Sequence, residues 1–122
     1  MTEVLSYESI KKGVLAGTIR ELIGTGRLLR SDVQMVIPQR TFERRLSLNQ
    51  TLKIDEADAI ARLLRVRDHA HEIFDDNRVA EEWLSLPSPA LGDEVPIEMA
   101  RTDIGAREVE AVLTRFAHGV HA

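Results

Sequence analysis

The chain has 122 residues, 43% of them hydrophobic, which is enough for one ordinary domain or two very small ones that share a core. It contains no cysteine, which excludes disulfides, thiolate nucleophiles and thiolate metal sites. Residues 1–67 hold 12 Lys and Arg against 8 Asp and Glu, a net charge of +4, whereas residues 68–122 hold 4 against 12, a net charge of −8. The first part suits a phosphate-bearing partner and the second a protein partner, and a chance unevenness of a solvated surface is the alternative.

Two helices are predicted before residue 37. Apolar residues recur at close to helical spacing over residues 7–23, and Gly24-Thr25-Gly26 ends this helix. A shorter helix is predicted over residues 28–36, with Ser31 or Asp32 able to cap its start.

A short basic helix is predicted from about Gln39 to Leu46, after the tight joint Ile37-Pro38. Proline is tolerated there because its missing N–H would have no partner in the first helical turn. On a helical wheel, the apolar side holds Phe42 and Leu46, and the opposite side holds Arg40, Arg44 and Ser47.

Two arginines that project together suit nucleic acid, because each guanidinium can bind a phosphate or the edge of a guanine with two hydrogen bonds. A short helix, a tight turn and this second helix follow one another as in a helix-turn-helix, whose second helix enters the major groove. The residues predicted to contact DNA are Gln39, Arg40, Thr41, Arg44 and Arg45. A solvated basic face on a plain helical bundle is the alternative, and the spacing alone leaves both open.

A long amphipathic helix is predicted from Glu56 to about Phe74, with Asp55 as its cap and Asp75-Asp76-Asn77 as its end. Its apolar stripe consists of Ala57, Ile60, Leu64, Val66, Ala70 and Ile73. A short helix over residues 78–86 follows, and Val79, Trp83 and Leu86 share one of its sides. We expect Trp83 to pack in the core.

Prolines and a glycine predict a turn-rich connector over residues 87–96, and one helical turn is predicted over residues 97–101. The last helix is predicted to run from a cap at Thr102 or Asp103 to about Ala117, with Gly119 as its stop. Its apolar stripe is Ala106, Val109, Val112, Leu113 and Phe116. Gly92 and Gly105 are expected where a side chain would clash or where φ must be positive.

No catalytic or metal-binding constellation is found in the sequence. His69 and His71 would point about 200° apart on a helix and cannot share an ion, and His118 and His121 lie at the end of the chain. No glycine-rich phosphate loop or nucleophile elbow occurs. We therefore expect no enzyme activity, no metal and no cofactor.

The stretch 80–119 closely resembles the toxin-binding domain of the Xre/MbcA/ParS-type antitoxins. The matching residues are Trp83-Leu84, Pro87, Pro89-Ala90-Leu91-Gly92, Pro96, Thr102, Gly105-Ala106, Val109, Leu113, Arg115 and His118-Gly119. The preceding stretch is similar to the Xre-like DNA-binding region of that family. It matches at Ile37-Pro38-x-Arg40-Thr41-Phe42-x-Arg44-Arg45, Asp55-Glu56-x-Asp58 and Arg62-Leu63.

The resemblance implies an all-α fold, with an Xre-like helix-turn-helix region over residues 1–74 and a small helical toxin-binding domain over residues 75–122. It implies an antitoxin that neutralises a RES-type toxin, which degrades NAD, and that represses its own operon by binding operator DNA. The end of the chain would then reach the toxin's active site, with Arg115, His118 and Gly119 at its mouth and Val120, His121 and Ala122 beyond.

Two other readings stay open. The chain could be a dimeric helix-turn-helix transcriptional regulator with no toxin partner, or a protein-binding adaptor that has lost DNA binding. For an antitoxin or a regulator that binds DNA we expect a homodimer, or a dimer formed within the toxin complex, because helix-turn-helix proteins commonly bind two half-sites. Neither a membrane span nor a signal peptide is evident, so we expect a cytoplasmic protein.

Overall fold

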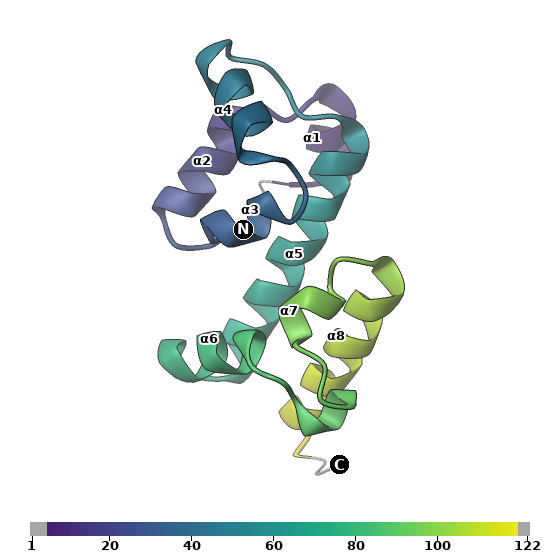
Figure 1. Ribbon diagram of the computed structural model, residues 1–122. Helices are drawn as coiled ribbons and strands as arrows, with labels where there is room; N and C mark the ends of the chain where they lie inside the picture. Colours follow the sequence, from purple (N-terminus) through teal and green to yellow (C-terminus); the bar gives the residue numbers. More distant parts are fainter. Residues whose placement is uncertain (1–4, 120–122) are drawn as a thin grey trace. The chain divides into compact units, whose positions relative to one another are not determined.

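The computed structural model describes residues 5–119, whose regular structure is helical (Figure 1). The elements are α1 (Tyr7–Lys12), α2 (Ala16–Gly24), α3 (Arg30–Gln34), α4 (Gln39–Ser47), α5 (Ile54–Ile73), α6 (Asn77–Ser85), the 3₁₀ turn η1 (Pro89–Leu91), α7 (Pro96–Met99) and α8 (Asp103–Ala117). Two isolated β-bridges occur among the described residues, and no strand does. The predicted all-α class is confirmed.

The chain forms two compact units, unit 1 over residues 1–61 and unit 2 over residues 62–122, and the boundary falls inside α5. The functional boundary predicted between residues 74 and 75 is a different division and stays a prediction. None of the described helices combines the length and the apolar character that crossing a membrane requires.

The predicted helix over residues 7–23 is two helices, because the backbone between them pairs with another segment. The Ala16 N–H donates to the Gln50 carbonyl at 3.0 Å, and the Leu52 N–H donates to the Val14 carbonyl at 2.8 Å. Gly13 turns the chain between α1 and α2 with φ +111°, a conformation that side chains disfavour. Long-range pairing therefore overrides the local helical periodicity here.

The core of unit 1 is aliphatic, with one aromatic residue, and α2 packs against α4. The buried side chains include Val14, Ala16, Ile19, Leu22, Leu28, Val33, Ile37, Phe42, Leu52, Ala57 and Ile60. Asp32 does not cap α3 from the position before the helix: its carboxylate lies in the first turn and accepts a hydrogen bond from the Leu29 N–H at 2.8 Å. Asp32 thus provides an acceptor for a backbone N–H at the start of α3 that has no partner within the helix.

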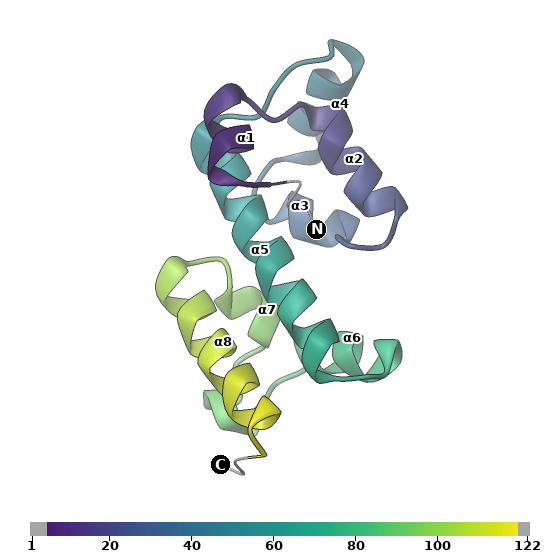
Figure 2. The same ribbon diagram turned by 180° about the vertical axis from the view of Figure 1, so that it is seen from behind.

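In unit 2, α7 packs against both α6 and α8, and η1 packs against α8 (Figure 2). The predicted stripe of α8 is confirmed: Ala106, Val109, Val112 and Leu113 are buried, and Phe116 is half-buried. The Arg62 guanidinium donates to the carbonyls of Ala100 (3.0 Å) and Arg101 (2.8 Å), which fastens α5 to the turn before α8.

Both glycine predictions in unit 2 are confirmed. Gly92 ends η1 with φ +63°. A Cβ on Gly105 would lie 1.9 Å from the Met99 carbonyl oxygen, so only glycine fits there. The start of α8 is capped by Thr102, whose hydroxyl accepts a hydrogen bond from the Gly105 N–H at 3.0 Å.

Candidate binding surfaces

The first candidate surface is the exposed side of α4. Arg40 and Arg44 are exposed one turn apart, and Phe42 is buried on the opposite side, as the helical wheel predicts. Gln39 is exposed in the first turn, and Thr41 is half-buried at the margin. Because α4 packs against α2 through its other side, the Arg40 and Arg44 guanidiniums both face solvent.

Arg45 lies apart from the other four residues predicted to contact DNA. It is 8% exposed, and its guanidinium forms an ion pair with Glu56 of α5. The same carboxylate accepts a hydrogen bond from the Lys53 N–H at 2.8 Å, at the start of α5. Arg45 is therefore occupied in holding α4 against the beginning of α5, because breaking such a pair leaves a charge poorly solvated.

The second candidate surface is a groove of about 800 Å³ in unit 2. Its lining comes from α6, the connector and α8, and consists of Val79, Glu82, Trp83, Leu86, Pro87, Ser88, Pro89, Ala90 and Phe116. Val79 is 38% exposed and Leu86 is 56% exposed, so α6 and the residue after it present apolar side chains to solvent along this groove. Exposed apolar surface that is gathered in a hollow is typical of interaction sites.

The prediction that Trp83 packs in the core is wrong in part. Trp83 is half-buried and lines the groove, and its ring lies 5.6 Å from that of Phe74 and 6.0 Å from that of Phe116. Phe74 and Phe116 are themselves 6.0 Å apart. The core side of α6 is formed by Ala80 and Leu84 instead. Trp83 and Phe116 thus both line the groove, and the Phe74 ring packs against both of them.

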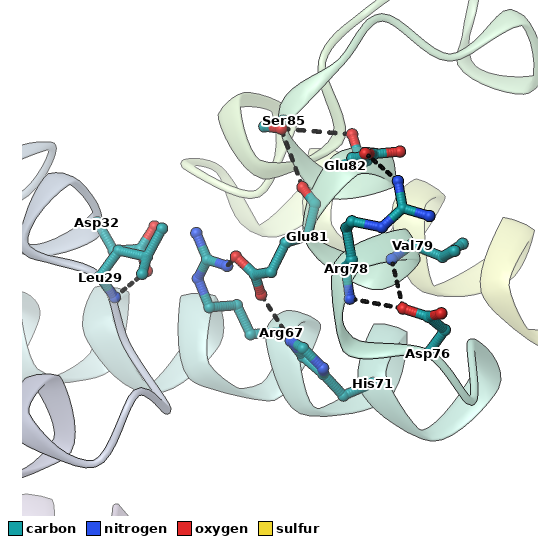
Figure 3. A network of polar contacts seen from close by, with 10 residues as sticks. All are labelled: Leu29, Asp32, Arg67, His71, Asp76, Arg78, Val79, Glu81, Glu82 and Ser85. Carbon is teal, nitrogen blue, oxygen red and sulfur yellow. Dashed lines mark hydrogen bonds and ion pairs between the residues drawn. The ribbon is translucent and has the colours of Figure 1, made fainter.

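Glu81 joins α6 to α5 through Arg67 and His71 (Figure 3). Its carboxylate accepts a hydrogen bond from the buried Arg67 guanidinium at 2.7 Å and meets the His71 ring nitrogen at 2.6 Å. Asp76 caps α6 by accepting from the N–H groups of Arg78 (2.8 Å) and Val79 (3.3 Å). The Asp76 cap and the two contacts of Glu81 therefore hold α6 in place, and with it the apolar side that faces the groove.

The end of α8 lies next to the groove, because Phe116 lines it and Arg115 precedes Phe116. Arg115 and His118 are exposed, and Gly119 follows with φ +69°. Of the residues predicted to bind a toxin, Arg115, His118 and Gly119 thus lie together on the surface. Val120, His121 and Ala122 lie outside the described residues.

Both histidines of α5 lie against glutamate side chains. His69 lies 3.6 Å from Glu110, which also accepts a hydrogen bond from Arg65 at 3.0 Å, and His71 contacts Glu81. Within residues 5–119, no group of three or more histidine and acidic side chains is arranged to hold a metal ion.

Residues 69–119 match the sequence model of the antitoxin Xre/MbcA/ParS C-terminal toxin-binding domain. The chain is also similar to proteins named Antitoxin Xre from three bacteria. It is 30% identical to that of Pseudomonas putida over 93% of this chain and 71% of the relative, and 31% identical to that of Yersinia enterocolitica over 93% and 78%. It is 35% identical to that of Photorhabdus laumondii over 80% and 64%.

The chain belongs to the Xre family of antitoxins. The match to the family's toxin-binding domain contains α6, η1, α7 and α8 entire, and with them every residue that lines the groove. This part of the Xre-family chain also carries the acidic excess. The sequence resemblance to an antitoxin is therefore confirmed for the family.

Proposed function

We propose that this chain neutralises a toxin protein through the groove of unit 2 and the neighbouring end of α8. The observation that carries the proposal is the position of the groove, whose exposed apolar side chains lie within the stretch that matches a toxin-binding domain. An apolar centre with a polar margin is the usual build of a protein–protein interface. Glu82 lines the groove and Glu108 is exposed on α8, and these acidic side chains favour a basic rim on the toxin, whereas the Glu110 carboxylate already contacts Arg65 and His69.

We propose further that the toxin has the RES fold and degrades NAD. This part of the proposal rests on the resemblance to the antitoxin family. The residues from Arg115 to Ala122 would then close the toxin's active site, as that resemblance implies. Arg115 suits this role because it is exposed and can reach a partner without leaving the core of unit 2.

We also propose that unit 1 binds operator DNA, through Gln39, Arg40, Thr41 and Arg44, and thereby represses the chain's own operon. The support is the exposure of two arginines one turn apart on a helix whose other side is anchored. A homodimer would bring two copies of α4 to two half-sites. Light scattering over a range of concentrations tests this assembly, and a monomer both alone and with the toxin contradicts it.

A dimeric transcriptional regulator without a toxin partner is the second candidate, favoured by α4 alone. Coexpression separates the two candidates. The candidate toxin, a RES-domain protein, is expressed in cells with and without this chain, and growth and complex formation are measured. Restored growth together with a stable complex supports the antitoxin proposal. If neither is observed although both proteins are folded, the result favours the transcriptional regulator without a toxin partner.

A further inference from the structure

Three exposed polar side chains of unit 1 form a row of hydrogen bonds. Gln34, at the end of α3, donates through Nε2 to Oε1 of Gln39 at 2.9 Å. Gln39, in the first turn of α4, donates through Nε2 to Oε1 of Glu43 at 3.0 Å. Exposed hydrogen bonds of this kind add little to folding stability, because they replace hydrogen bonds that the same groups would form with water. Their value lies in the orientation that they give to Gln39.

Glu43 determines which way the Gln39 amide points. An ionised carboxylate only accepts hydrogen bonds, so the NH₂ end of Gln39 must face Glu43. Its carbonyl end then faces Gln34, which supplies an N–H to it. A glutamine alone on a surface could present either end, whereas Gln39 has one preferred direction.

The Gln39 side-chain amide can form a further hydrogen bond at each of its two ends. Each NH₂ group has two hydrogens and each carbonyl oxygen accepts two hydrogen bonds, and only one of each is used in this row. A glutamine amide with one remaining donor and one remaining acceptor can pair with the N7 and N6 atoms of adenine in the major groove. We propose that Gln39 reads an adenine base and that Gln34 and Glu43 are the positioning residues that orient it; this inference rests on the proposed DNA binding.

The exposed face of α4 thus holds two parallel rows, each with a spacing of four residues. Gln39 and Glu43 form the row next to α3, and Arg40 and Arg44 form the other. The arginines supply the charge that attracts phosphates, which carries no sequence information by itself. A carboxylate among them opposes binding to arbitrary DNA, so Glu43 contributes to selectivity in two ways.

The experiment selects binding sites from a library of randomised DNA duplexes at fixed salt, with the full chain and three variants: Gln39→Ala, Glu43→Gln and Glu21→Gln. Glu21 is an exposed acid of α2, so Glu21→Gln changes the charge equally without touching the row. Circular dichroism verifies that each variant is folded. The enriched duplex is then remade with the selected adenine replaced by each other base.

For the wild type and for Glu21→Gln, replacing that adenine should weaken binding about tenfold, at the lower range of a bidentate base contact. For Gln39→Ala the same replacement should change binding less than about twofold. Glu43→Gln should bind arbitrary duplexes more tightly than Glu21→Gln does, and it should discriminate less at this one base pair.

Two results overturn the inference and are distinguishable. A wild-type chain that enriches no duplex overturns it together with the DNA-binding proposal. A wild-type chain that selects a site whose base preferences are unchanged in Gln39→Ala or in Glu43→Gln overturns the adenine reading by a held Gln39 and leaves DNA binding in place.

Discussion

Gly105 and Met99 lie so close that a Cβ atom on Gly105 would stand 1.9 Å from the Met99 carbonyl oxygen. The same Cβ would also lie 3.0 Å from the Thr102 hydroxyl that caps α8. Backbone cannot move aside as a side-chain tip can. The turn between α7 and α8 therefore requires a glycine at position 105.

Gly105→Ala should destabilise the chain by about 3 kcal/mol, the upper range for overpacking, since the clash is with backbone. Thermal unfolding followed by circular dichroism measures the effect. Gly17→Ala is the matched control, because Gly17 lies in α2 with no heavy atom within 4 Å of its Cβ position. That change should leave the stability equal or raise it by up to about 1 kcal/mol, since alanine favours helix. Equal effects of the two changes would contradict the packing described here.

Arg45→Ala should lower the free energy of unfolding by about 3 kcal/mol, because it leaves the Glu56 carboxylate without its ion-pair partner. Arg44→Ala should change stability by less than about 0.5 kcal/mol, because that side chain is exposed. Urea titration of both variants gives the comparison. If Arg45→Ala is as stable as the wild type, the ion pair with Glu56 does not hold α4 against α5.

Arg40 and Arg44 should supply charge for DNA binding. Replacing both with alanine should weaken binding to the promoter duplex, and the slope of log affinity against log salt should fall by about one for each phosphate that an arginine no longer neutralises. Arg78→Ala with Arg107→Ala removes the same charge from exposed positions of unit 2 and serves as the control. Gel-shift titrations at several salt concentrations measure both; identical slopes for the two double variants would argue against the α4 surface.

Leu86→Asp should weaken binding of the toxin at least tenfold, because it places a charge in the apolar groove, a cost of about 1.4 kcal/mol or more. Stability should hardly change, since Leu86 is 56% exposed. Ile104→Asp is the control: Ile104 is 74% exposed on α8 and does not line the groove. Calorimetric titration with the RES-domain protein tests both, and undiminished affinity of Leu86→Asp would exclude the groove from the interface.

Truncation after Phe116 should abolish rescue of cells that express the toxin, because it removes His118, Gly119 and the residues beyond. The fold should persist, since the removed residues of α8 and its cap that the structure describes are exposed. Rescue and pull-down of the complex are measured together. A truncated chain that rescues fully would show that the end of the chain is dispensable and that the site assignment is wrong.

Local rules were enough for several features of the fold. A hydroxyl at Thr102 and a carboxylate at Asp76 cap helices because free N–H groups at a helix start need an acceptor nearby in sequence. The period of 3.6 residues places Arg40 and Arg44 together and gathers the buried stripe of α8. Each of these depends on the spacing of residues within one helix, which the sequence by itself specifies.

Other features were decided by contacts between distant segments. The break after α1 exists because residues 14–16 pair with the backbone of residues 50–52, and Arg45 is buried because Glu56 of α5 meets it. Periodicity groups Val79, Trp83 and Leu86 on one side of α6, but Ala80 and Leu84 form a second apolar side next to it. Only the packing of α6 and α7 decides that the smaller side is buried, which leaves the larger one to line an open groove.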